Sequence, residues 1–315
     1  MKKEKERMVM KVLNSIAELP ETSEYGLIIG NFDGVHLGHR KLLDEVSKEC
    51  VARNQDMVVI TFVPHPLITL RNEKSFLLNT YEERQDLLKE HGVSWLIEIP
   101  FTRDLSMTDP SDFLEHYILC NKNVKTLFLG HDFAFGANKK GDHRFVKEYC
   151  SDKPIDVEVQ KKFTIDTKTY SSSLVRQLLK SGNPKEASDL LGRNFFVSGR
   201  VIKGLGRGKQ LGFPTANIDL VKERLVPEFG VYGTMCSFRG CTYRSITNIG
   251  KNPTFDDVSG INVETNVFDF SGDLYGEEIK VTFIDKLRDE QKFSSVNELI
   301  DQIKKDIERR KSWSD

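Results

Sequence analysis

The stretch Gly30-Asn-Phe-Asp-Gly-Val-His-Leu-Gly-His39 decides the fold of the first half of this chain, because of what stands on either side of it. The apolar run at 26–29 is typical of a buried strand, and Leu42, Leu43 and Val46 follow at helical spacing. A glycine-bearing turn at a helix N-terminus presents free backbone N–H groups and the positive end of the helix dipole, which attract phosphate. The stretch therefore predicts a nucleotide-binding turn between a strand and a helix.

Outward from this turn, short apolar runs alternate with helical patterns through the rest of the first half. Further strands are expected at 57–63, 95–99 and 124–129. Helices are expected to begin at Thr80, where Glu83 completes a capping box, and at Asp109-Pro110, where proline suits the first helical position. The alternation predicts a parallel α/β sheet with helices on both faces, which binds ligands beyond the carboxyl ends of its strands.

The second half has a different pattern, and turn residues clustered at 181–192 mark the change. We expect one domain over 1–184 and another over 185–315. Strand-like runs in the second half are spaced as in an antiparallel barrel or sandwich, at 195–202, 231–238, 242–248, 262–270 and 278–284. A closing helix at 296–313 carries an apolar stripe that is expected to pack on the barrel.

Composition excludes several classes of protein. A chain of 315 residues favours two domains, and a net charge of −1 gives no general attraction to nucleic acid or to an anionic membrane. No apolar run approaches the roughly 20 residues that span a bilayer, and no signal core follows the basic start, so a cytoplasmic protein is expected. The five cysteines are scattered without a CxxC pair, which predicts neither a disulfide framework nor a zinc site.

The histidines are unevenly distributed: all seven lie in the first half. A general base in the second half would therefore be a carboxylate. In the first half, His36 and His39 are three residues apart, which places both imidazoles on one face of the first helical turn. They could contact a phosphate and neutralise its charge, or they could be surface residues. A metal pair is the third alternative, but no further ligand follows at a suitable spacing.

A second glycine-rich stretch opens the second half and runs from Gly199 to Asn217 with five glycines. It is not a Walker A loop, because Gln210 follows Lys209, and it lacks the Rossmann spacing. It could wrap a phosphate or simply form a turn. Thr215 and Asn217 are two residues apart, so their side chains face the same way on an extended segment. A hydroxyl and an amide oxygen placed so can position Mg²⁺ and phosphate oxygens.

The motifs of the first half, in chain order, resemble the adenylyltransferase module of bacterial bifunctional riboflavin kinase/FAD synthetase, a Rossmann-like nucleotidylyltransferase. They are GNFDGVHLGH at 30–39, TFVPHP at 61–66, GHDFAFG at 130–136 and SSSLVR at 171–176. The resemblance implies that His36 and His39 act on the ATP phosphates. It implies nucleotide binding by Gly30, Asn31, Phe32, Asp33, Gly34, Ser172, Ser173 and Arg176, and flavin binding by Asp132 and Phe62. From the residues alone, the serine run is explained equally well as a helix cap.

The motifs of the second half resemble the flavokinase module of the same family. They are FPTAN at 213–217, VETNVFDF at 263–270, NIGKNPTF at 248–255 and LRDEQKF at 287–293. The resemblance implies that Glu264 is the catalytic base, that Thr215 and Asn217 hold Mg²⁺ and nucleotide, and that Arg288 lies near the flavin. Gly204, Gly206 and Gly208 would approach the phosphates. The chain departs from the family pattern mildly, with Ser173 in place of threonine and Gly233 in place of alanine.

The resemblance implies a multifunctional transferase of flavin biosynthesis. It would phosphorylate riboflavin to FMN and then adenylylate FMN to FAD, with ATP as co-substrate, Mg²⁺ as cofactor and pyrophosphate as the second product. The partners expected are these small molecules, with no nucleic acid or membrane, and the chain would be a monomer or a weak homo-oligomer. Two alternatives stay open: only one module is active, or the chain is a flavin-binding regulatory protein with the same folds.

Overall fold

The computed structural model of the chain describes residues 10–131, 133–160, 164–165, 168–204, 206–251 and 261–314. Contacts divide the chain into two units. The first consists of Met1–Glu73 and Thr80–Tyr170, and the second of Lys74–Asn79 and Ser171–Asp315. These two units are defined by their internal contacts. The functional domains expected over 1–184 and 185–315 stay a prediction.

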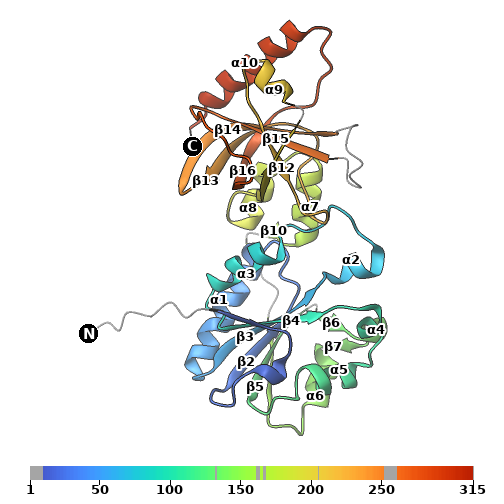
Figure 1. Cartoon of the computed structure of the whole chain (residues 1–315). Helices are drawn as coiled ribbons and strands as arrows, with labels where there is room; N and C mark the ends of the chain where they lie inside the picture. The colour runs from blue at the N-terminus through green and yellow to red at the C-terminus, as the bar shows by residue number, and fades with distance from the viewer. Residues whose placement is uncertain are drawn as a thin grey trace, which may run out of the picture. The chain divides into compact units, whose positions relative to one another are not determined.

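The first unit contains a six-stranded parallel sheet in the order β1-β4-β3-β2-β5-β8 (Figure 1). Its strands are β1 Lys11–Leu13, β2 Tyr25–Ile29, β3 Asp56–Val63, β4 Trp95–Pro100, β5 Val124–Gly130 and β8 Asp156–Gln160. The predicted parallel α/β sheet is therefore confirmed. The two edge strands, β1 and β8, were not predicted. Only three residues form β1, whereas β8 alternates acidic residues with valines, a strand pattern that was overlooked.

Helices cover both faces of this sheet, as predicted. The main ones are α1 Leu37–Ala52, α3 Tyr81–Lys89, α5 Pro110–Tyr117 and α6 His143–Tyr149. Successive residues of β2 enter two separate apolar cores: Leu27 packs with residues of α5 and α6, whereas Ile28 packs with residues of α1 and α3. Such alternation is what a strand buried on both faces requires. Thr80 and Glu83 form the predicted capping box at the start of α3.

The shorter elements of the first unit lie around this framework. They are the strands β6 Ala134–Phe135, β7 Gly141–Asp142, β9 Thr164–Ile165 and β10 Lys168–Thr169, the helices α2 Pro66–Arg71 and α4 Arg103–Ser106, and the 3₁₀ turns Ile16–Glu18 and Ala137–Lys139. The strands β6 and β7 form one two-stranded sheet, and β9 and β10 form another.

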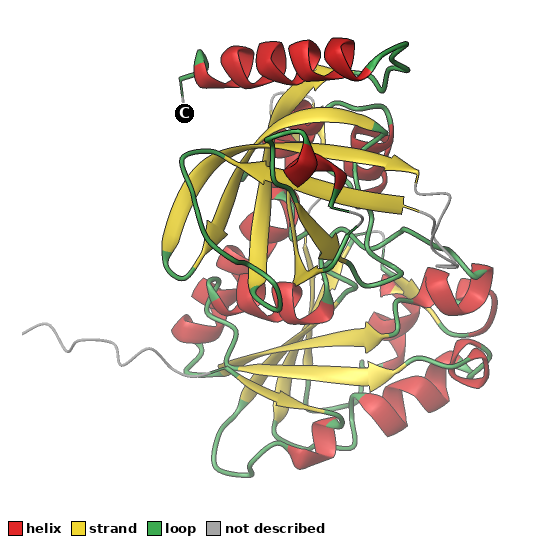
Figure 2. Cartoon of the chain, turned by 45° about the horizontal axis from the view of Figure 1, so that its top comes forward, coloured by secondary structure: helices red, strands yellow, loops and turns green. Residues whose placement is uncertain are grey.

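The second unit contains a closed barrel of strands (Figure 2). Their order is β11-β12-β15-β14-β13-β16, and every pair is antiparallel. The strands are β11 Phe196–Ile202, β12 Ala216–Asp219, β13 Gly230–Phe238, β14 Cys241–Lys251, β15 Ile261–Val267 and β16 Glu278–Arg288. The barrel was one of two predicted architectures. The strand β12 was not predicted, since its four residues overlap the FPTAN motif, which was considered only for phosphate and metal binding.

The described residues of the second unit form four helices: α7 Ser172–Lys180, α8 Pro184–Leu191, α9 Arg207–Gln210 and α10 Val296–Lys311. The last of these packs on the barrel differently from the expected apolar stripe. Ile307 joins a small core with Val231 and Phe268, but the buried side chains of α10 are Asp306 and Arg310. The Arg310 guanidinium donates to the Thr234 carbonyl oxygen at 3.1 and 3.2 Å. The buried charged side chains of α10, rather than an apolar stripe, therefore make up much of its contact with the barrel.

The segment Lys74–Asn79 comes from the first half of the sequence but belongs to the second unit. The backbone N–H groups of Phe76 and Leu77 donate to the Glu223 carbonyl oxygen, and the Leu225 N–H donates to that of Leu77. Arg224, which is 3% exposed, donates from Nη1 to the same Leu77 oxygen at 2.9 Å. The barrel unit therefore includes a short stretch of chain that lies about a hundred residues before it.

Candidate functional sites

The loop between β2 and α1 forms the first candidate site, at the carboxyl end of a central strand of the sheet. Its backbone takes left-handed conformations at Phe32, Gly34 and Val35, with φ of 48°, 84° and 36°. Such angles cost energy in residues other than glycine, so they mark a loop whose shape the surroundings impose. Phe32 and Val35 are buried in the core under α1 and hold the loop down.

His36 and His39 lie together, as their spacing predicted. His36 is the N-cap of α1, and its Nδ1 accepts a hydrogen bond from the His39 backbone N–H at 3.2 Å. The two rings are stacked, with centroids 3.7 Å apart and planes 13° from parallel. Because Nδ1 of His36 is an acceptor, the proton of the neutral ring is on Nε2. His36 can therefore donate a hydrogen bond from its outer nitrogen.

The environment of His39 does not favour the positive charge that neutralisation of a phosphate would need. Burial, and then the neighbouring His36, lower the pKa of His39 well below its usual value of 6.5. A ring with such a pKa is neutral near pH 7, so it does not neutralise a phosphate with a full positive charge. It can still donate a hydrogen bond to a phosphate oxygen whose negative charge grows during a reaction.

Two polar atoms of this loop and of the first turn of α1 are buried without a hydrogen-bond partner among the described residues: Oδ1 of Asn31 and Nδ1 of His39. Buried polar atoms in folded proteins are almost always paired, so each exception calls for an explanation. A polar ligand lying on the loop would give both atoms a partner. These two atoms therefore support a binding role for the loop independently of any motif.

Residues outside the motif anchor the loop. The buried Arg84 of α3 donates from Nη1 to the Asn31 carbonyl oxygen at 3.1 Å, and Thr61 donates its hydroxyl to the same oxygen at 3.4 Å. Glu98 of β4 holds Arg84 through an ion pair of 2.9 Å. Neither Arg84 nor Glu98 was predicted from the sequence. The only signal was an ionisable residue at a position of α3 that the helical spacing turns toward the core.

The remaining predicted residues of the first half have varied positions. Phe62 is the second-last residue of β3 and is half-buried, and its ring makes an edge contact with the Phe101 ring, with centroids 5.5 Å apart. Asp132, predicted to bind flavin, lies outside the described residues. Gly30 and Asp33 belong to the same β2–α1 loop as the histidine pair, and the Gly30 N–H donates to the Ile60 carbonyl oxygen. The structure therefore brings most of the first motif into one loop.

The serine run at 171–173 lies at the start of α7, in the second unit. Ser171 is the N-cap and accepts from the Leu174 N–H at 3.2 Å, so the helix-cap explanation holds for that residue. Ser172 and Ser173 are the first two helical residues. Arg176 is 8% exposed, donates from Nε to the Phe76 carbonyl oxygen at 2.9 Å, and stacks on the Phe76 ring at 3.7 Å. The segment Lys74–Asn79 therefore orients the predicted phosphate-binding arginine.

The second candidate site lies on the barrel around Glu264 of β15. Asn217 of β12 and Asn248 of β14 are its register partners on either side. The next residue, Thr265, is fully buried and hydrogen-bonds with Thr247 at 2.9 Å. Because side chains alternate along a strand, Glu264 faces the opposite side of the sheet, where it is half-buried. Glu264 is therefore not a fully solvent-exposed residue.

The glycine-rich loop lies directly against Thr215 and Asn217. A Cβ added to Gly204 would be 2.2 Å from the Asn217 amide nitrogen, and one added to Gly208 would be 3.2 Å from the Thr215 hydroxyl. Side chains at these two glycines would therefore displace the groups that the motif assigns to phosphate and metal. Gly206 instead has a left-handed φ of 68° and open space around it.

Arg288 ends β16 and is held by helix α10. Its Nε donates to both carboxylate oxygens of Asp306, at 3.2 and 2.9 Å, and Asp306 is only 4% exposed. Gln302 donates to the same carboxylate at 2.8 Å. The ion pair fixes one edge of the guanidinium at the end of the barrel. Asp306 was not predicted from the sequence, because the prediction for this helix rested on its apolar residues alone.

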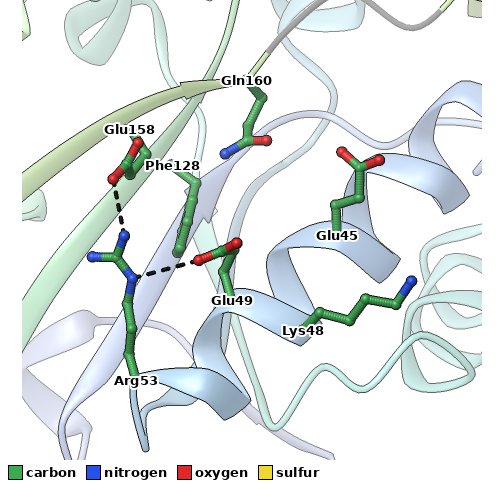
Figure 3. Close-up of a pocket in the computed structure, with 7 residues that line it drawn as sticks. All are labelled: Glu45, Lys48, Glu49, Arg53, Phe128, Glu158 and Gln160. Carbon is green, nitrogen blue, oxygen red and sulfur yellow. Dashed lines mark hydrogen bonds and ion pairs between the residues drawn. The ribbon is translucent and has the colours of Figure 1, made fainter.

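A pocket of about 310 Å³ on the first unit contains none of the predicted residues (Figure 3). Residues of α1, β5 and β8 line it, and Arg53 stands at its edge. The Arg53 guanidinium is bound by Glu158 at 2.9 Å and Asp156 at 3.0 Å, with Glu49 at 3.7 Å. An arginine surrounded by three carboxylates is not available to an anionic ligand.

Two family models match separate parts of the chain. The family model of FAD synthetase matches residues 19–174, and the flavokinase model, described as riboflavin kinase, matches residues 191–314. Bifunctional riboflavin kinase/FMN adenylyltransferase from Bacillus subtilis (strain 168) is 33% identical over 290 residues, which cover 91% of each chain. The protein of that name from Escherichia coli (strain K12) is 35% identical over 303 residues, covering 94% of this chain and 96% of its own.

Among solved structures, a crystal structure described as a macrolide-efflux protein from Streptococcus pneumoniae is similar over the whole length. It has a TM-score of 0.85 and 32% sequence identity, and the match covers 97% of this chain and 99% of that one. In the part of this chain that the structure describes, no helix combines the length and the hydropathy needed to cross a membrane.

Proposed function

Because this chain belongs to the bifunctional riboflavin kinase/FMN adenylyltransferase family and makes FMN and FAD, we propose that each reaction has its own site, formed by the residues identified above. The β2–α1 loop with its histidine pair serves adenylylation, and the barrel face around Glu264 serves phosphorylation. The observation that carries the proposal is a pair of buried polar atoms, Oδ1 of Asn31 and Nδ1 of His39, which have no hydrogen-bond partner among the described residues. The half-buried Glu264 carboxylate beside the FPTAN segment supports the second site.

In the adenylylation step, a phosphate oxygen of FMN attacks the α-phosphorus of ATP, and the bond from that phosphorus to the bridging oxygen breaks to release pyrophosphate. Negative charge develops on the oxygens of the α-phosphoryl group and of the leaving group. His36 and His39 stabilise it as neutral hydrogen-bond donors, together with the backbone N–H groups at the start of α1. Ser172, Ser173 and Arg176 are proposed to bind the triphosphate, and Phe62 and Asp132 the flavin.

In the phosphorylation step, the primary hydroxyl oxygen of riboflavin attacks the γ-phosphorus of ATP, ADP leaves, and the hydroxyl proton passes to Glu264. Most of the rate enhancement in phosphoryl transfer comes from positioning and charge stabilisation, and a base directs the nucleophile. The loop with Gly204, Gly206 and Gly208 approaches the phosphates. Arg288 is proposed to contact the flavin from the end of the barrel.

The donors at this site fit Mg²⁺. Thr215 and Asn217 offer a hydroxyl and an amide oxygen, and Mg²⁺ prefers hard oxygen ligands with several positions left to phosphate and water. Within the described residues, no cluster of three or more histidine, cysteine or acidic side chains could hold a metal ion. When bound, Mg²⁺ would neutralise phosphate charge. A cytoplasmic location and a monomeric or weakly oligomeric state stay predictions.

Steady-state kinetics of the two half-reactions test this assignment. Replacing His36 and His39 together with alanine should lower kcat for FAD formation by about 10²-fold or more, and should leave riboflavin phosphorylation nearly unchanged. Glu264→Gln should lower kcat for FMN formation by about 10²-fold or more while FMN adenylylation continues. A variant that loses both reactions equally, or neither, would contradict the proposed division. If the unaltered chain makes FMN but no FAD, only the kinase module is active.

A further inference from the structure

Glu264 is held by a residue to which no role has been given. Asn262 lies two residues before it on β15, so both side chains are on the same face of the sheet. The Asn262 side-chain amide donates to the Glu264 carboxylate oxygen Oε1 across 2.7 Å. A carboxylate can only accept, so the orientation of the amide is settled: its NH₂ group faces Glu264.

The bond is short for an N–H donor, as is usual when the acceptor carries charge. Among the described residues, it is the one hydrogen bond that the Glu264 carboxylate makes, although Asn217 and Asn248 are its neighbours on the adjacent strands. A glutamate has three rotatable side-chain bonds and many rotamers, so a single fixed point at Oε1 decides where the other oxygen lies. That second oxygen stays available to accept a proton.

We propose that Asn262 is a positioning residue for riboflavin phosphorylation, which orients the Glu264 carboxylate toward the hydroxyl of the substrate. This inference rests on the proposed role of Glu264 as the base. Asn262 itself touches neither substrate nor nucleotide in this account. Its effect should therefore appear in kcat, with little change in KM for riboflavin or ATP.

The test compares four variants in both half-reactions. Asn262→Asp keeps the shape of the side chain but removes the donor, so kcat for FMN formation should fall by roughly tenfold to a hundredfold, part of the 10²–10⁴-fold that a general base contributes. Asn262→Ala should lower this kcat by a similar factor. Asn262→Gln retains an amide donor and should recover part of the rate. Asn297→Asp places the same charge on an exposed residue of α10 and should not change the rate.

FMN adenylylation by the same chain should stay at the parental rate, and unchanged KM values for riboflavin and ATP in the kinase reaction report that the barrel of each variant is folded. The decisive comparison adds Asn262→Asp to Glu264→Gln. If Asn262 acts through Glu264, the added substitution should change the remaining kinase rate by less than about threefold, because residues acting as a unit are not additive. A full tenfold further loss, or a normal kcat in Asn262→Asp alone, would overturn the inference about Asn262. A normal kcat in Glu264→Gln would instead overturn the proposed base.

Discussion

Replacing Arg224 with methionine should strongly destabilise the barrel unit, although Arg224 has no assigned role in either reaction. The guanidinium is 3% exposed and donates to the Leu77 carbonyl oxygen at 2.9 Å and to that of Phe196. Each hydrogen bond from a charged group to a buried acceptor contributes about 1.5–3 kcal/mol. The Leu77 oxygen keeps the N–H of Leu225, and the methionine side chain fills part of the space. We therefore expect a net loss of about 3 kcal/mol.

Urea unfolding measures this loss. Trp95 and Trp313 are the two tryptophans of the chain, so a Trp95→Phe background leaves Trp313 as a fluorescent reporter in the barrel unit. With a urea m-value of about 1.5–2 kcal/mol/M, the unfolding midpoint should fall by roughly 1.5–2 M. Arg200→Met, at an exposed position of β11, is the matched control and should shift the midpoint little. Equal midpoints for the two variants would refute the reasoning.

Three further results are expected. Gly233→Ala should cost about 1–3 kcal/mol in urea unfolding, because the new Cβ would lie 2.2 Å from the Trp313 ring and 2.7 Å from Cδ of Arg310; a smaller cost in a Trp313→Leu background would confirm the cause, and an equal cost would exclude it. His39 has a pKa below its unfolded value of 6.5, so its contribution to stability is complete above pH 6.5 and is lost at lower pH, by up to about 1.4 kcal/mol per pH unit. Unfolding midpoints at pH 7.5 and 5.5 should therefore differ more in the parent than in His39→Asn, and equal differences would contradict the assignment. A thiol reagent at pH 8 should label only the exposed Cys120 and Cys241 in the native chain, since the other three cysteines are buried and burial raises the pKa of both Cys50 and Cys236 to about 12; a third reactive thiol would contradict this.

The sequence predicted what depends on local pattern. The strands β2 to β5, the capping box at Thr80 and the barrel strands have clear periodicity or turn signals, so they were found with small errors at their ends. The strands β1 and β12 are three and four residues long, too short for a period to be recognised. The pairing of His36 with His39 was predictable because helical geometry fixes the distance between residues three apart.

The residues that hold the sites in place could not be predicted in this way. Arg84 reaches Asn31 across 53 residues, and Asp306 reaches Arg288 from a helix whose interpretation relied on apolar residues alone. Partners so distant in sequence are brought together only by the tertiary fold. The neutral state of His39 also depends on burial, which neither its spacing nor its motif reveals.

The central claim is that one chain carries two chemically independent sites, and a mixing experiment tests it most directly. The His36→Ala/His39→Ala variant, given riboflavin, ATP and Mg²⁺, should stop at FMN. The Glu264→Gln variant should make almost no product from riboflavin. Mixed in one solution, the two variants should make FAD from riboflavin, because FMN released by one is adenylylated by the other. A mixture that yields no more FAD than either variant alone, while the parent chain yields FAD, would contradict the account.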